Sequence, residues 1–112
     1  MNANIFIPDQ NIRSAIGEGL RWCDYWGIAT SARPLFDDET WPLERGVIVF
    51  EPSEGDDFES EELNYMAIVN GLESMALGSP DYFGNMFDEG MIDCETGDVF
   101  LQHCLFGEVI YG

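Results

Sequence analysis

The sequence predicts a small α+β domain, with about four helices packed on a short antiparallel sheet. Apolar residues recur at helical spacing in two long segments, and one short run, 46–51, is rich in β-branched residues. The chain has 112 residues, of which 46% are hydrophobic, and this is the apolar content of a folded protein. We therefore expect residues 1–112 to form a single acidic globular domain.

The first helix is predicted to begin at Pro8 and Asp9, where the Asp9 carboxylate can accept hydrogen bonds from the free amides of the first turn. Apolar residues follow at spacings of three and four, and Gly27 is placed to end the helix. These apolar residues are Ile12, Ile16, Leu20 and Cys23. Gly17 and Gly19 each weaken the helix by roughly 1 kcal/mol relative to alanine, so the helix depends on packing.

The densest aromatic group in the sequence closes this helix. It consists of Trp22, Tyr25 and Trp26. We interpret the group as a corner of the core, and the alternative is an exposed anchor for a partner.

A short sheet is predicted in the next segment. Residues 46–51 read as a strand, which can pair in antiparallel fashion with residues 28–33. Pro34 and Pro42 mark the connection between them as a loop. Three consecutive acids of this loop are Asp37, Asp38 and Glu39.

The acidic run 51–62 follows the strand directly, and seven of its twelve residues are carboxylates. Pro52 and Gly55 keep the run irregular. Ser60 is then the expected N-cap of the longest helix, from Glu61 to about Leu77, with acids favourable near its positive end. Its predicted buried stripe contains Tyr65, Ile68, Val69, Leu72, Met75 and Ala76, widened by Leu63 and Met66.

Two further helices are expected towards the C-terminus. Ser79 and Pro80 start a short one that runs to about Asp88, with Asp81, Asp88 and Glu89 along it. The segment 96–107 reads better as a helix, capped by Thr96 or Asp98 and stopped by Gly107, than as a strand. Residues 109–111 could close the chain as an edge strand.

The charge is strongly asymmetric. The formal net charge is -18, all four cations are arginines, and none follows Arg45, whereas 15 acids lie from Gly46 onward. A potential of this size repels nucleic acid and anionic membranes and attracts basic surfaces. The expected partner is therefore a basic protein surface, with no direct binding of nucleic acid or membrane.

Targeting signals are not evident in the sequence. The start lacks a basic segment and a long apolar run, and no stretch approaches the ~20 apolar residues of a membrane span. Three cysteines, Cys23, Cys94 and Cys104, fit reduced core thiols better than a disulfide framework. We expect a cytoplasmic protein.

Catalytic and metal-binding motifs are weak. Cys94, His103 and Cys104 lack the spacing of a zinc site, and no stretch matches the calcium-loop template. His103 lies in an apolar segment, where a core or boundary role is the usual outcome, and exposed carboxylate pairs are usually solvated. We therefore expect neither an enzyme nor a cofactor.

The remaining signal is the acidic surface itself. Carboxylates spaced along a strand or a helix can form a row similar to a phosphate backbone. In size, charge, lack of lysine and mixed α/β composition, the chain resembles the small acidic inhibitors of host defence used by phages and mobile elements, namely DNA-mimicking anti-CRISPR and anti-restriction proteins. The resemblance implies competition for the basic nucleic-acid groove of a host enzyme, without any bond being broken.

The expected partner-binding residues are the acids of the loop, of the acidic run and of the later helices. They are Asp37, Asp38, Glu39, Glu51, Glu54, Asp56, Asp57, Glu59, Glu61, Glu62, Asp81, Asp88 and Glu89. Three other interpretations stay open: an acidic adaptor or antitoxin-like module that binds a basic partner without mimicry, a salt-adapted surface, and an enzyme.

Overall fold

The computed structural model of the chain describes residues 7–30, 47–53 and 58–112. Along the chain its elements are α1 (Asp9–Trp22), η1 (Cys23–Tyr25), β1 (Gly27–Ala29), β2 (Ile48–Pro52), β3 (Glu61–Leu63), α2 (Tyr65–Gly78), α3 (Pro80–Asn85), η2 (Glu89–Met91) and α4 (Cys94–Phe106). The described residues thus contain four α-helices, two short 3-10 helices and a three-stranded antiparallel sheet, and the predicted α+β class is confirmed.

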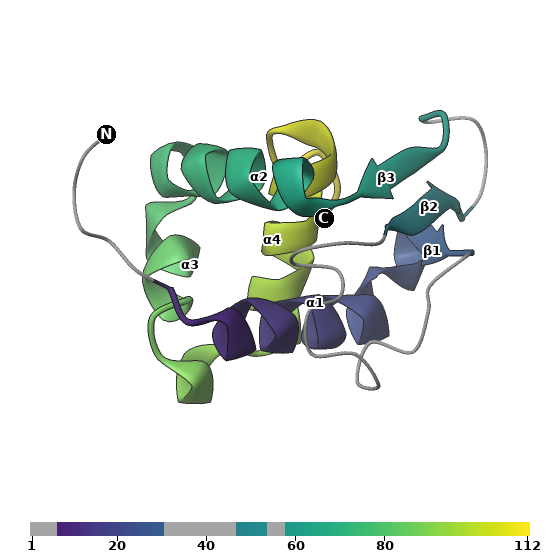
Figure 1. Cartoon of the computed structure of the whole chain (residues 1–112). Helices are drawn as coiled ribbons and strands as arrows, with labels where there is room; N and C mark the ends of the chain where they lie inside the picture. The colour runs from purple at the N-terminus through teal and green to yellow at the C-terminus, as the bar shows by residue number, and fades with distance from the viewer. Residues whose placement is uncertain (1–6, 31–46, 54–57) are drawn as a thin grey trace.

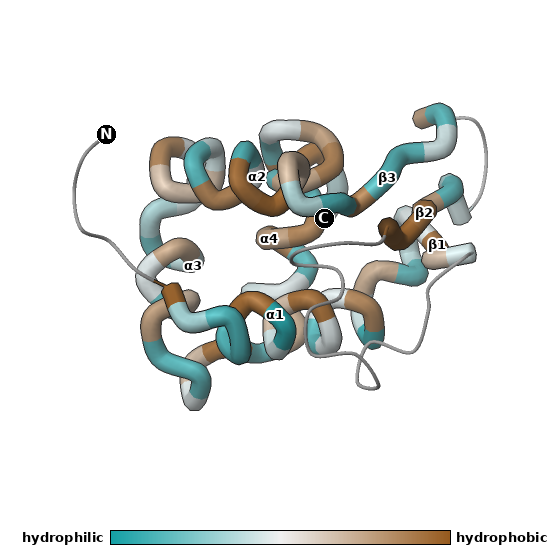
Figure 2. Tube along the Cα trace, viewed as in Figure 1, coloured by the Kyte–Doolittle hydropathy of each residue, from teal (hydrophilic) through white to brown (hydrophobic). Residues whose placement is uncertain are grey.

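Helix α4 is the centre of the fold. It lies between α1 and α2 (Figure 1), and every residue from Thr96 to Leu105 is buried. Hydrophobic residues of α2 gather on the side that faces α4 (Figure 2). A helix buried on all sides must be apolar or must satisfy its polar groups internally, and α4 carries Asp98, Gln102 and His103.

Glycines bring the helices on either side close to α4. A Cβ at Gly19 of α1 would lie 2.6 Å from the carbonyl oxygen of Gly97. A Cβ at Gly71 of α2 would lie 2.5 Å from Cys104 Sγ. Both distances are shorter than real Cβ contacts, so these crossings require glycine. Gly19 therefore weakens α1 as an isolated helix but permits its packing in the domain.

The sheet covers one end of the helical layers, in the order β1-β2-β3 (Figure 1). Ile48 pairs with Leu63, and both are fully buried. Trp26 stacks on Phe50 at a centroid distance of 6.1 Å and on Tyr111 at 5.7 Å. The prediction of a strand at 46–51 is confirmed, and its expected pairing with residues 28–33 is confirmed for the described part.

The expected start of the longest helix at Glu61 is wrong. Residues 61–63 form β3, and α2 begins at Tyr65 because the Asn64 side chain accepts a hydrogen bond of 2.9 Å from the Ala67 amide. Leu63 fills the core opposite Ile48, and this pairing keeps the segment extended. The acids at 59, 61 and 62 therefore do not lie at a helix terminus.

The predicted stripe of α2 is correct at its centre and wrong at its start. Ile68 and Met75 are buried, whereas Tyr65 and Met66 are 54% and 58% exposed. The predicted buried stripe includes one turn too many at its N-terminal end, because α2 begins at Tyr65 and not at Glu61.

Other boundaries also differ from the expectations. No side chain caps α1, so the predicted role of Asp9 as an acceptor is wrong, and Gly27 pairs within β1 rather than ending the helix. Helix α3 begins at Pro80 as predicted but ends at Asn85, which leaves Asp88 and Glu89 beyond it.

The C-terminal helix is confirmed, and Gly107, with φ 78°, ends it as predicted. The predicted caps at Thr96 and Asp98 are wrong, because Asp93 caps the helix through a 2.8 Å hydrogen bond from the Thr96 amide.

The predicted edge strand at 109–111 is wrong. The amides of Ile110 and Tyr111 both donate to Gln102 Oε1 at 2.8 Å. The Gln102 side chain therefore accepts the hydrogen bonds of these two amides and holds the segment against α4 in an irregular conformation.

Candidate functional site

The acids predicted to bind a partner divide into three groups. Asp37, Asp38, Glu39, Glu54, Asp56 and Asp57 lie outside the described residues. Glu51, Glu59, Glu61 and Glu62 lie on or next to β2 and β3. Asp81, Asp88 and Glu89 lie on or after α3, at the opposite end of the molecule from the sheet (Figure 1). The predicted acids that the structure describes thus form two separate clusters instead of one row.

Strand geometry sorts the acids of the sheet by face. Glu62 pairs with Val49, and Glu51 pairs with Ile28, so these side chains share the outer face of the sheet, turned away from Ile48 and Phe50. Glu51 and Glu62 are exposed and are diagonal neighbours across β2 and β3, which places their Cβ atoms roughly 7 Å apart. We call this surface, defined by Ile28, Val49, Glu51 and Glu62, the outer sheet face.

Glu61 does not belong to the outer sheet face. It pairs with Phe50, whose side chain points into the core, and it is only partly exposed at the sheet edge. Adjacent residues of a strand point to opposite faces, so Glu61 and Glu62 cannot lie in one row. The expectation that both contribute to a single row of carboxylates is corrected here.

The second cluster includes acids with local structural roles. Asp88 accepts a 3.0 Å hydrogen bond from the Gly90 amide and caps η2. Glu89 accepts a 2.7 Å hydrogen bond from the Ser14 hydroxyl of α1. Asp81 is exposed in the first turn of α3, where a negative charge is favourable. The hydrogen bonds and the helix terminus therefore give each of these three acids a structural role.

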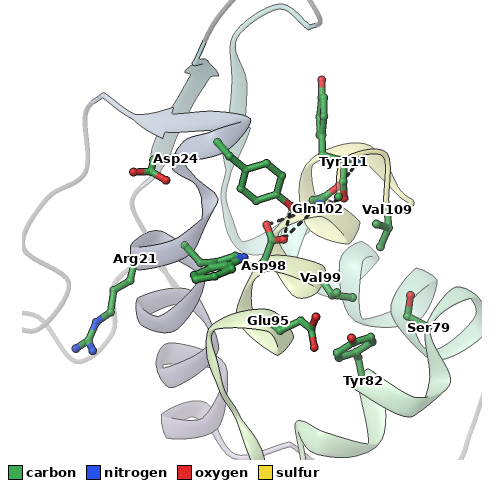
Figure 3. A pocket seen from close by; sticks show the side chains of 13 residues that line it. Arg21, Asp24, Ser79, Tyr82, Glu95, Asp98, Val99, Gln102, Val109 and Tyr111 are labelled. Atoms are coloured by element: carbon green, nitrogen blue, oxygen red, sulfur yellow. Dashed lines mark hydrogen bonds between the residues drawn. The ribbon is translucent and has the colours of Figure 1, made fainter.

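A pocket of about 900 Å³ opens beside α4, where the end of α1, the start of α3 and the C-terminal segment meet. We call it the Asp98 pocket. Trp22, Tyr25, Tyr82, Glu95 and Asp98 are among its lining residues. Figure 3 shows the Asp98 carboxylate directed towards Gln102, while Tyr82 and Glu95 lie together on another side.

Asp98 is only 5% exposed and is held by neutral donors. The Tyr25 hydroxyl and Trp26 Nε1 each donate to it at 2.6 Å, and Gln102 Nε2 lies 3.4 Å from both of its oxygens. Desolvation and the hydrogen bond to Asp98 raise the pKa of the Tyr25 phenol above its ordinary value, because the protonated phenol is the hydrogen-bond donor. The carboxylate thus fixes the aromatic corner to α4.

The aromatic group proves to be both core and surface. Trp26 is 3% exposed, as expected for the core interpretation, whereas Trp22 and Tyr25 are 52% and 48% exposed.

His103 forms a hydrogen-bonded chain between α2 and α3. The Ser74 hydroxyl donates to the Gly71 carbonyl at 3.1 Å, so its oxygen accepts from His103 Nδ1 at 3.0 Å. His103 Nε2 is then unprotonated and accepts from the Ser79 hydroxyl at 2.9 Å. Burial lowers the pKa of the imidazole, which agrees with this neutral form. The predicted core or boundary position of His103 is confirmed.

Two further observations concern the whole described part. No group of three or more His, Cys, Asp or Glu side chains is placed there to hold a metal ion. None of its helices has the length and apolar character needed to cross a membrane.

Sequence reasoning missed the buried hydrogen-bonded pair of Asp98 and Gln102. It treated Asp98 only as a possible cap, although the two residues are four apart on a helix and therefore share one face. Polar residues at this spacing within an apolar helix were the available signal. Comparison with protein-family models, curated proteins and solved structures finds no match for this chain.

Proposed function

We propose that this protein is an inhibitory binding protein whose acidic surface occupies the basic nucleic-acid-binding groove of a defence complex or another nucleic-acid enzyme. The observation that carries the proposal is the position of Glu51 and Glu62 as diagonal neighbours on the outer sheet face. Both carboxylates are exposed, and no cation follows Arg45 in the sequence. Positive side chains of a partner can therefore approach this face without a competing positive charge from the later part of the chain.

The spacing of these carboxylates suits a surface that binds phosphates. The roughly 7 Å between Glu51 and Glu62 follows from their diagonal positions on adjacent strands. Arginine and lysine side chains that normally bind successive phosphates can pair with carboxylates at such a spacing. The mechanism is competition for the groove, and it requires no chemical step on the partner.

The sheet provides a rigid base for the interaction. Ile48, Phe50 and Leu63 anchor β2 and β3 from below and are fully buried. Ile28 lies opposite Glu51 and Val49 lies opposite Glu62 on the same face, and both add apolar contact area beside the glutamates. Preorganised charges lose less conformational entropy on binding than charges on a free chain.

A second candidate function is an acidic adaptor that binds a basic protein without blocking nucleic acid. The separate cluster of Asp81, Asp88 and Glu89 favours it, because acids at opposite ends of the molecule need not enter one groove. The two candidates differ in whether the partner can bind DNA and this protein at the same time.

Competition with duplex DNA tests the proposal. The immobilised protein is offered to a panel of purified RNA-guided nucleases and restriction endonucleases, and each bound enzyme is challenged with a duplex containing its target site. Mimicry predicts that the duplex displaces the bound enzyme and that the free protein inhibits cleavage. It also predicts that the affinity falls steeply as the salt concentration rises.

A bound enzyme that retains DNA and forms a ternary complex would contradict mimicry and would support the adaptor. Failure to bind any member of the panel would contradict the proposed class of partner.

A further inference from the structure

The Asp98 pocket is separate from the outer sheet face and has its own chemistry. Its lining comes from α1, η1, α3, α4 and the C-terminal segment, and its volume of about 900 Å³ lies in the range of small-molecule sites. On one side of the pocket, Asp98 of α4 accepts hydrogen bonds from Gln102 and from Tyr25.

Aromatic rings form a large part of its wall. Trp22 and Tyr25 remain about half exposed, and Tyr82 lies across the pocket from α1. The faces of such rings attract cations. The hydrogen bond of 2.6 Å from the Tyr25 hydroxyl to Asp98 increases this attraction, because a negative acceptor polarises the phenol and makes its ring more electron-rich.

The charges of the lining favour a positive ligand. The lining includes three carboxylates, on Asp24, Glu95 and Asp98, and a single guanidinium, that of Arg21. Figure 3 shows the Arg21 side chain extending away from Asp98. Tyr25, Trp26 and Gln102, which donate hydrogen bonds to Asp98, are all neutral side chains, so none of them brings a positive charge to this wall of the pocket.

We propose that the Asp98 pocket binds an organic cation, with its ammonium or guanidinium group among Trp22, Tyr25 and the carboxylates and its apolar stem along the rings. A weakly hydrated organic cation can use both the ring faces and the negative field, whereas a compact inorganic ion is bound chiefly by oxygen ligands. The ligand has two possible sources, a free polyamine or an arginine or lysine side chain of a protein partner.

Calorimetric titration of the full chain with spermidine and with N-acetyl-argininamide tests this site. We expect saturable binding of at least one probe at constant ionic strength, and a signal from one probe alone identifies the source of the cation. Trp22→Ala should weaken binding about fivefold through loss of one ring face. Glu95→Gln is a second variant, which removes one negative charge from an exposed side chain without changing its shape. It should weaken binding of the cation.

Glu73→Gln is the matched control, because Glu73 is an exposed glutamate of α2 outside the pocket lining. Equal weakening by Glu73→Gln and Glu95→Gln would show general attraction to an acidic surface and would overturn the site. Absence of saturable binding of both probes would overturn it as well. The site does not depend on the proposed function, since Glu51→Lys with Glu62→Lys should leave both titrations unchanged.

Discussion

The crossing of α1 and α4 predicts a mutational effect opposite in sign to helix propensity. Helix propensity alone favours alanine over glycine at position 19 by roughly 1 kcal/mol. In the folded domain, a Cβ at Gly19 would lie 2.6 Å from the carbonyl oxygen of Gly97 and 2.6 Å from Leu101 Cδ1. Ordinary contact begins at 3.4 Å, so the two helices would have to separate by several tenths of an ångström.

The expected magnitude follows from these two opposing terms. Overpacking of a tight core contact costs about 1–3 kcal/mol, and the upper end applies because a backbone atom cannot rotate away. After the gain in propensity, Gly19→Ala should lower the free energy of unfolding by about 2 kcal/mol. For a domain of this size the midpoint of thermal unfolding should fall by roughly 8 °C.

Gly84→Ala provides the control for this experiment. Gly84 lies in α3, and a Cβ there would meet no atom within 4 Å, so alanine should stabilise the protein by roughly 0.4–1 kcal/mol. Urea and thermal unfolding followed by circular dichroism measure both variants. If Gly19→Ala were as stable as the parent while Gly84→Ala gained stability, the close contact between α1 and α4 would be refuted.

Three further predictions concern a cap, a histidine and the thiols. Asn64→Ala should cost about 1 kcal/mol in urea unfolding, whereas Ser60→Ala should have almost no effect; equal losses would contradict a helix that starts after Asn64. Burial lowers the pKa of His103 in the folded protein, so on acidification the unfolded chain binds a proton at this side chain before the folded chain does. The free energy of unfolding should therefore be highest above about pH 6.5 and should fall as the pH drops below that value. A midpoint above pH 6.5 in an NMR titration of His103 in the folded protein would refute this. Burial raises the pKa of the Cys104 thiol, so little of it is in the reactive thiolate form, whereas Cys94 is partly exposed. In the native protein, iodoacetamide should therefore label Cys94 before Cys104, as measured by mass spectrometry. Faster labelling of Cys104 would contradict its burial.

The sequence was sufficient for much of the fold because the patterns involved are local. The spacing of Ile12 and Ile16, the β-branched run before Glu51, and Pro80 at a helix start all correspond to elements of the structure. Gly107 ends α4 with a positive φ, which glycine adopts at little cost.

The errors arose where tertiary contacts decide between local alternatives. Ser60 and Asn64 are both suitable N-cap residues for α2. The pairing of Leu63 with Ile48 keeps residues 61–63 extended, so the helix can begin only after Asn64. The C-terminal segment has strand propensity, but the amides of Ile110 and Tyr111 donate to Gln102 and not to a neighbouring strand. Neither contact can be read from neighbouring residues.

The candidate sites were predicted to different degrees. Glu51 and Glu62 were expected at a binding surface, and the strand register supplies the face on which they lie, which composition alone cannot give. Asp98 was expected only as a possible helix cap, because its position in the pocket depends on a contact with Tyr25 across 73 residues of sequence.

Charge reversal on the outer sheet face is the most direct test of the proposed inhibition. Glu51→Lys with Glu62→Lys is compared with Glu73→Lys and Asp81→Lys, which changes the net charge equally at exposed helical positions. With an enzyme from the panel that the parent protein inhibits, the first pair should abolish inhibition of cleavage and the second should retain most of it. Equal inhibition by both pairs, with folding intact, would contradict the account.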